Sequence, residues 1–433
     1  MSVFTIYCHG TGGSAGQGIE KAEIINIFSN HSPGVSGSHD RILMPNDAFC
    51  NWKKTQVFNA RNIVKSRPEH ITLEGVAGNG MPHNRWFNYT TGQWQHDKQF
   101  LPKPKMILAA VGLGVDRNVE NAVNYLEWMA LNKMLPQKIN MLGWSRGAIA
   151  SIRIAYELSK IPHFSNIPVN IFAIDPVAGV GHNNEHRILG NVKNMVSIIS
   201  TGENRRGFSP MITSTYLSLV HPYQTRYIEL NFPGLHASAA KSTNAVGRIC
   251  FNLAYRFLTH HGTKCGILDM FKMSNRACLD AYGLLLQHRG GTNGVHDKKD
   301  PYKNEKGVPT THSFVNAMVT GLGRKERQIV TNTSSPFFYN SHHEAIFQLV
   351  YPKIYNSFII NQSNSGVLLR DVNTQDEWAS LKLQVGEAVT KIILYEIENF
   401  YGPLFIEGES VVQEKSFMFD MNLFDDEVLR TRM

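Results

Sequence analysis

The sequence predicts an α/β fold in which a mostly parallel sheet is covered by helices on both faces. Short apolar, β-branched runs alternate with longer segments of helical periodicity through about the first 260 residues. The short runs are almost continuously hydrophobic, which is typical of strands buried on both faces of a parallel sheet. We therefore expect strands at Val3–Cys8, Met106–Val111, Lys138–Leu142, Val169–Ile174, Met195–Ile199 and Tyr227–Leu230.

Two of the segments between these runs have clear helical spacing. Asn118–Leu131 is amphipathic, and Ala148–Ile161 carries apolar residues at every third or fourth position, namely Ile149, Ile152, Ala155, Leu158 and Ile161. A strand, helix, strand order of this kind favours parallel pairing, because the helix returns the chain to the same end of the sheet.

Two regions depart from this alternation of expected strands and helices. Residues 30–105 are loop-rich and contain a group of aromatic side chains, Trp52, Trp86, Phe87, Tyr89 and Trp94. We expect four of these, Trp86, Phe87, Tyr89 and Trp94, to form either a lid or membrane-facing lip over a pocket or ordinary core, which is the commoner use of such residues. We expect one domain over residues 1–262 and a C-terminal α+β extension over 263–433, in which Ser357–Ile360 and Ala388–Tyr395 resemble strands. The sequence does not indicate the role of this extension.

Composition narrows the class of protein. The chain of 433 residues has a formal charge of +8 but no dense Lys/Arg block, so we expect a diffusely basic surface and no nucleic-acid partner. Five cysteines without a C-x-x-C pair argue against a disulfide framework or a cysteine-rich zinc site and favour a reducing compartment. We expect no cleaved signal peptide, because a strand-like stretch begins at Val3, and no membrane-spanning helix, because no apolar run reaches about 18 residues. The sequence thus predicts a cytoplasmic chain, whose contact with an anionic membrane would be peripheral.

The segment Gly143–Gly147 has the pattern G-x-S-x-G between an expected strand and an expected helix. A nucleophilic serine at this place sits on a tight strand-to-helix turn, whose neighbours at −2 and +2 must be small. The helix N-terminus then directs free N–H groups and its positive dipole end at the reacting atoms. We predict that Ser145 is the nucleophile and that the N–H of Arg146 forms half of an oxyanion hole. The alternative is a plain tight turn.

Such a serine needs a histidine base held by a carboxylate, and the chain order in this fold is serine, acid, histidine. His236 closely follows an expected strand, and Pro233 and Gly234 supply a turn that would bring its imidazole over the edge of the sheet. We expect His236 to be the base. The other histidines after the serine are expected in loops or on the surface: His163, His182, His186, His221, His260 and His261.

Two carboxylates compete for the role of acid. Asp175 ends one expected strand and is the more common residue type for this task, so we favour it slightly. Glu203 follows the next strand, which is the more usual source of the acid in this topology. Glu203 would otherwise form an ion pair with Arg205 or Arg206.

The glycine-rich segment His9–Ser14 follows the first expected strand. It lacks the lysine and spacing of a phosphate-binding loop, so we expect it to supply the second oxyanion donor, from Thr11 or Gly12, unless it is only a flexible turn. The Arg146 side chain would either steer an anionic group of the substrate or lie exposed at the start of the helix. His182 and His186 are spaced as metal ligands, but their Asn- and Gly-rich surroundings favour a loop, and we predict no metal site.

Seven segments, in the same order, resemble one family of α/β-hydrolases, the family that includes bacterial phospholipase effectors of the type VI secretion system. They are Gly10–Gly12, Gly75–Gly80, Gly112–Leu126, Gly143–Ala148, Asp175–Gly181, Glu203–Phe208 and Pro233–Ser238. The chain departs from that family at three places. His9 stands where the family has Asp, Pro176 replaces Thr, and Ala237–Ala240 replaces a Ser-Asp-x-Gly-Gly segment.

The resemblance implies an α/β-hydrolase-like sheet and hydrolysis of an ester in a phospholipid or another acyl lipid, through an acyl-enzyme and without a metal or organic cofactor. It also implies a bacterial effector that is delivered into another cell. A thioesterase or protein deacylase would use the same residues. The non-enzymatic alternative is a binding or scaffold protein in which the turn around Ser145 survives as structure only. The sequence does not indicate an oligomeric state.

Overall fold

The computed structural model describes residues 2–11, 23–33, 67–75, 85–96, 114–179, 184–203, 206–266, 268, 272–287, 327, 333, 337–359 and 375–385. Its centre is a six-stranded sheet with the order β10-β8-β6-β5-β1-β2. All neighbours in this sheet pair in parallel. The strands are β1 (Val3–Cys8), β2 (His70–Leu73), β5 (Lys138–Trp144), β6 (Val169–Ile174), β8 (Val192–Ser200) and β10 (Arg226–Phe232).

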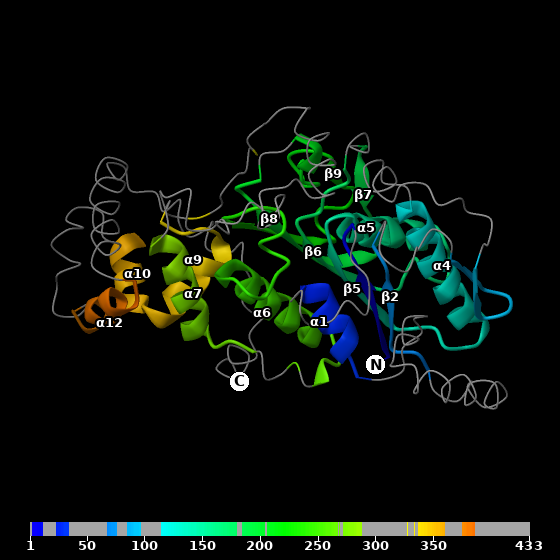
Figure 1. Ribbon diagram of the computed structural model, residues 1–433, viewed down its shortest axis with the longest axis horizontal. Helices are drawn as coiled ribbons and strands as arrows, with labels where there is room; N and C mark the ends of the chain where they lie inside the picture. The colour runs from blue at the N-terminus through cyan, green and yellow to red at the C-terminus, as the bar shows by residue number, and fades with distance from the viewer. Residues whose placement is uncertain are drawn as a thin grey trace, which may run out of the picture.

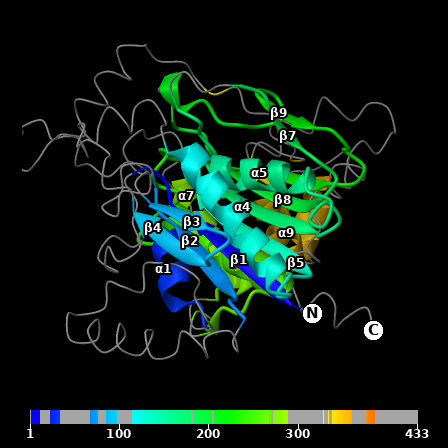
Figure 2. The same cartoon turned by 90° about the vertical axis from the view of Figure 1, so that its right-hand side faces the viewer.

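Helices cover both faces of this sheet (Figures 1 and 2). Apolar side chains of α4 (Val115–Leu131) and α5 (Arg146–Ser159) pack with Ile6 and Met141 on one face. On the other face, α1 (Ile24–His31) and α6 (Ala245–His260) pack with Tyr7, Leu142 and Phe172. Successive residues of β1 and β5 thus point into opposite layers, as strands buried on both sides require. The prediction of a mostly parallel sheet with helices on both faces is confirmed.

The expected elements agree with the structure over most of their length. Two strands have the expected bounds, and β5, β8 and β10 extend further than expected. Both expected helices exist, and α5 begins at Arg146, directly after the predicted nucleophile. The expected strand Met106–Val111 lies outside the described residues.

Part of the loop-rich segment forms a small antiparallel hairpin of β3 (Arg85–Asn88) and β4 (Gln93–His96). Phe87 of this hairpin is 1% exposed and packs on Tyr125 and Trp128 of α4. Tyr89, at the tip, is 49% exposed. The core interpretation therefore holds for Phe87, whereas Trp52 lies outside the described residues.

The described C-terminal part is helical and lies beside α6, at the end of the molecule away from α4 (Figure 1). It contains α7 (Asn275–Gln287), α9 (Ser341–Val350), α10 (Pro352–Ile359) and α12 (Gln375–Val385). The prediction of a strand at Ser357–Ile360 was wrong, because residues 357–359 continue α10. Tyr351, Ile354 and Tyr355 are buried at helical spacing, a pattern that begins before the apolar run by which the strand was predicted. The predicted strand Ala388–Tyr395 lies outside the described residues.

The predicted boundary near residue 262 stays a prediction. One cluster of buried side chains contains residues from both sides of it, among them Phe28, Phe232, Tyr282 and Phe337. A further pair of short parallel strands, β7 (His186–Ile188) and β9 (Leu217–Leu219), lies apart from the main sheet. Among the described helices, none is both long and apolar enough to cross a bilayer.

A chain of polar side chains crosses the middle of the sheet. Asn140, Asn170 and Asn194 stand at matching register on β5, β6 and β8. Asn194 donates to Asn170, and Asn170 donates to Asn140, each over 2.8 Å. Asn140 in turn donates to Thr263 Oγ1 over 2.8 Å. We call this chain the asparagine ladder.

Candidate active site

Ser145 stands at the junction of β5 and α5 with φ 56° and ψ −123°, a strained conformation for a residue with a Cβ. Its neighbours explain the two glycines of the motif. A Cβ on Gly143 would lie 2.6 Å from the backbone N of Ala148, and one on Gly147 would lie 2.1 Å from the carbonyl O of Cys8. Both contacts are sterically forbidden, so the close approach of β1, β5 and α5 requires glycine at both places.

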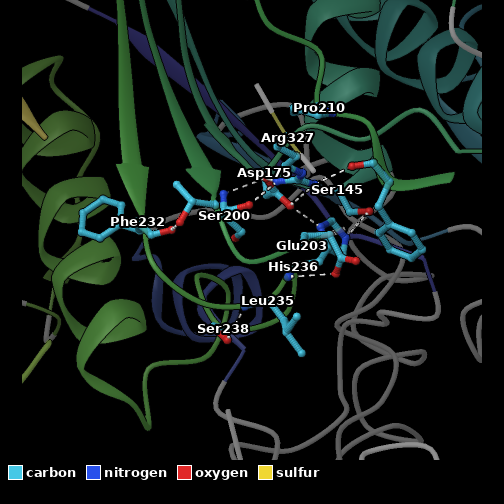
Figure 3. Close-up of polar contacts among 12 residues, drawn as sticks. Ser145, Asp175, Ser200, Glu203, Pro210, Phe232, Leu235, His236, Ser238 and Arg327 are labelled. Carbon is cyan, nitrogen blue, oxygen red and sulfur yellow. Dashed lines mark hydrogen bonds and ion pairs between the residues drawn. The ribbon is translucent and has the colours of Figure 1, made fainter. Parts of the chain in front are cut away.

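His236 reaches Ser145 from the turn that follows β10. Gly234 has φ 105°, and its carbonyl accepts a hydrogen bond from Gly202 N over 2.9 Å, which joins this turn to the end of β8. The imidazole Nε2 lies 2.9 Å from Ser145 Oγ. The ring packs between Trp144, with centroids 5.5 Å apart, and Phe208, at 4.9 Å. The structure thus brings together the predicted nucleophile and the predicted base (Figure 3).

Asp175 lies on the other side of the imidazole, with Oδ2 2.6 Å from His236 Nδ1. Like Ser145 it ends a strand and has a positive φ, of 40°. An ionised carboxylate only accepts hydrogen bonds, so Nδ1 carries the proton and Nε2 is left to accept the Ser145 hydroxyl. This is the tautomer that a general base requires.

Glu203, the second predicted acid, takes a different place. It is 1% exposed, and its Oε2 accepts a hydrogen bond from the backbone N of His236 over 3.3 Å. It therefore fixes the main chain of the turn, whereas Asp175 contacts the imidazole. Arg205 and the side chain of Arg206, its alternative partners, lie outside the described residues.

Two opposing effects act on the Asp175 carboxyl group, which is completely buried. Burial alone would raise its pKa, but the positive charge of Arg327 and then the contact with His236 outweigh burial and lower the pKa to about 2. Asp175 is therefore ionised throughout the neutral range.

Arg327 was not predicted as a site residue. Its Nη1 lies 2.6 Å from Asp175 Oδ1, and its Nη2 lies 3.1 Å from Asp175 Oδ2. The same two nitrogens donate to the carbonyls of Ser200 and Phe208. No local pattern marks an arginine that acts over 152 positions of the chain, so only the folded structure reveals it.

Arg146 is buried beside the serine, so its predicted alternative as an exposed residue is wrong. Its guanidinium donates to Thr11 Oγ1 over 2.9 Å and to the carbonyl of Ala178 over 3.1 Å. Burial lowers its pKa to about 10, so it stays cationic at neutral pH. Its backbone N–H belongs to the first turn of α5, where amides have no partner within the helix. A positive charge and a helix N-terminus therefore lie next to Ser145.

The predicted oxyanion loop begins at the end of β1, next to β5. His9 is 2% exposed, and its Nδ1 lies 3.2 Å from Glu23 Oε1, which ties the start of this loop to α1. A Cβ on Gly10 would lie 2.6 Å from the Trp144 ring, so the loop passes close over the residue before the serine. Thr11 accepts the Arg146 hydrogen bond described above, while Gly12 lies outside the described residues.

The histidines expected in loops or on the surface are found in several environments. His163 is partly exposed and pairs with Glu127, and His260 and His261 end α6. His186 begins β7 rather than lying in a loop, and His182 falls outside the described residues. Metal binding by these last two stays untested.

No protein-family model matches this chain, and no curated protein matches it. Two chains of solved structures do match. One is an uncharacterized protein from Pseudomonas aeruginosa, with 11% sequence identity and a TM-score of 0.33 over 98% of this chain and 78% of that chain. A likeness of this size carries no information about function, which is therefore inferred from the geometry of the site.

Proposed function

We propose that this protein is a serine hydrolase with an α/β-hydrolase fold and that it cleaves carboxylic esters of lipids. One observation carries the proposal: Ser145 Oγ, His236 and Asp175 form a continuous chain of contacts of 2.9 and 2.6 Å, buried at the end of the sheet. Three residues separated by 30 and 61 positions rarely meet in this order without a function, because each carries a cost in strain or desolvation.

The reaction follows from the positions of the protons on Ser145 and His236. Ser145 Oγ attacks the acyl carbonyl carbon while His236 Nε2 takes the hydroxyl proton and then passes it to the departing alkoxide. Asp175 stabilises the imidazolium that forms in between. Water then attacks the acyl-enzyme, His236 accepts its proton, and the proton returns to Ser145 as the carboxylic acid leaves.

The oxyanion that forms in both steps requires hydrogen-bond donors that face the carbonyl oxygen of the substrate. The N–H of Arg146 and an N–H of the loop around Thr11 are suitably located, because β1 is the neighbour of β5. Loss of one such donor typically lowers the rate about 10²- to 10³-fold.

The fold assignment is supported by two features of the described chain. The residues occur in the order serine, acid, histidine, which is the order of α/β-hydrolases and differs from the orders in chymotrypsin-like and subtilisin-like enzymes. The nucleophile also follows a strand at the centre of the sheet, and the glycine-rich loop follows the adjacent strand.

The lipid part of the proposal has separate support. The seven segments that resemble the phospholipase family include the regions of Ser145, Asp175 and His236. The net charge of +8 would favour contact with an anionic surface. The buried Arg146 cation beside the serine is suited to a substrate with negative charge near its ester.

The decisive experiment is labelling with a fluorophosphonate probe, with and without anionic phospholipid vesicles. We expect the wild type to be labelled and Ser145→Ala to be unlabelled and inactive while remaining folded. Ser151→Ala is the matched control, because this serine is also buried in the same helix but donates to the carbonyl of Gly147. Labelling that persists in Ser145→Ala would refute the assignment, and an unlabelled wild type would favour a binding or scaffold protein.

Substrate class needs a second measurement. We expect release of fatty acid from phospholipid vesicles to exceed hydrolysis of a triglyceride emulsion and of an acyl thioester. A preference for the thioester would keep the nucleophile but replace the lipase assignment with a thioesterase or protein deacylase.

A further inference from the structure

We propose that Arg327 is a positioning residue of this site, which holds the Asp175 carboxylate in the orientation that His236 needs. The inference rests on the proposed function and adds to it a residue from the C-terminal part of the chain. Figure 3 shows Arg327 beside Asp175, with His236 beyond the carboxylate.

Four hydrogen bonds fix the orientation of the Asp175 carboxylate. Oδ1 accepts from Ser200 N over 3.0 Å and from Arg327 Nη1, while Oδ2 is shared by Arg327 Nη2 and His236 Nδ1. A planar guanidinium that binds both oxygens sets the plane of the carboxylate, which a single bond to Ser200 N would leave free to rotate. The direction of Oδ2 toward Nδ1 therefore depends on Arg327.

Arg327 is itself held by the main chain. Its Nη1 donates to the carbonyl of Ser200 over 2.6 Å and its Nη2 to that of Phe208 over 2.5 Å. Ser200 ends β8, and Phe208 packs on the His236 ring at 4.9 Å. The Arg327 guanidinium thus links Asp175 to the end of β8 and to the segment of Phe208, which packs against His236.

This arrangement is costly as a device for stability alone. The Arg327 side chain is 4% exposed and the Asp175 side chain is completely buried. The Nε of Arg327 is also buried without a hydrogen-bond partner. Desolvation of two ions commonly cancels the gain from their attraction, and an apolar pair would often be as stable. A role in orienting the acid explains why the charges are placed here.

The test uses the full-length protein and measures the rate constants of fluorophosphonate labelling at Ser145 and of ester hydrolysis. We expect Arg327→Gln to lower both rates about 10- to 100-fold, the range that loss of outer-shell partners has at metal sites. Arg327→Lys should recover only part of the rate, because its ammonium keeps the positive charge but cannot bind both carboxylate oxygens as the guanidinium does.

Arg256→Gln is the matched control for the loss of a buried arginine. Arg256 is 9% exposed, and its Nη2 donates to the carbonyl of Met273. Equal rates in Arg327→Gln and wild type would overturn the inference, as would an equal loss of rate in Arg256→Gln. In both cases a labelled wild type leaves the proposed function standing, whereas an unlabelled wild type refutes the function first.

Discussion

Two buried polar networks cross the same three strands of this sheet, and they differ in charge and strain. The asparagine ladder joins β5, β6 and β8 through neutral amides, at strand positions without positive φ. The candidate site joins the ends of the same strands through Ser145, Asp175 and Ser200, with positive φ at the first two. Both are hydrogen-bonded and largely buried, with Asn194 half-buried, so burial alone does not separate them.

The difference shows which kind of buried polarity indicates chemistry. A ladder of identical amides at matching register satisfies its own groups and disfavours a slip of the strands, because any slip would leave buried amides unpaired. The site instead concentrates a strained serine, an ionised carboxylate and two buried arginines at one edge. Strain and charge that contribute nothing to packing are the features expected of a functional site.

The largest expected effect comes from the acid. We expect Asp175→Asn to lower kcat by about 10⁴-fold, because the amide favours the wrong tautomer of His236. Glu203→Gln is its matched control and should change kcat little, since an amide oxygen still accepts from the backbone N of His236. Steady-state ester hydrolysis, normalised to the folded fraction, checks both. A larger loss in Glu203→Gln would reverse the assignment of the acid.

Low pH should reduce the contribution of the candidate site to folding stability and leave that of the asparagine ladder unchanged. A pKa of Asp175 lowered from 3.8 to about 2 corresponds to about 2 kcal/mol of folding stability. Because the folded-state pKa is the lower one, this stability is present above the unfolded value and is lost as the pH falls through the folded value. Urea unfolding of wild type and Asp175→Asn between these two pH values measures it. If the free energy of unfolding changed equally with pH in the two proteins, the expectation would be contradicted.

The smallest expected effect on activity belongs to the asparagine ladder. We expect Asn170→Ala to lower the free energy of unfolding by about 1–3 kcal/mol, because the buried Asn140 Oδ1 and the half-buried Asn194 Nδ2 each lose their hydrogen-bond partner. The loss should be independent of pH, and kcat per folded molecule should not change. Asn132→Ala, at an exposed helix end, is the control. A fall in kcat in Asn170→Ala would mean that the two networks are coupled.

The sequence predicted those parts of the site that follow from local pattern. The turn around Ser145 is recognisable because its glycines are needed for contacts within a few residues and with one adjacent strand. His236 could be chosen because it follows a strand and a Pro-Gly turn. The fold class was predictable for the same reason, since strand hydrophobicity is local.

Features that depend on long-range geometry were not predictable in this way. The choice between Asp175 and Glu203 depends on which carboxylate faces the imidazole, and both follow neighbouring strands. The side chain of Arg146 was left open because its partners Thr11 and Ala178 come from two other strand ends. The run at Ser357–Ile360 misled because a short apolar segment fits a strand and a buried helix equally well.

The contact between Asp175 and Arg327 also bears on synthesis of the protein. The ribosome completes β5, α5, β6, β8 and β10 before residue 327 leaves the exit tunnel, so the sheet can assemble while the carboxylate lacks its strongest counter-charge. A nascent chain at that stage would bury Asp175 at a higher energetic cost than the finished protein does. If the sheet forms during translation, we expect the proposed hydrolytic activity to reach its full rate only after residue 327 has emerged and bound Asp175.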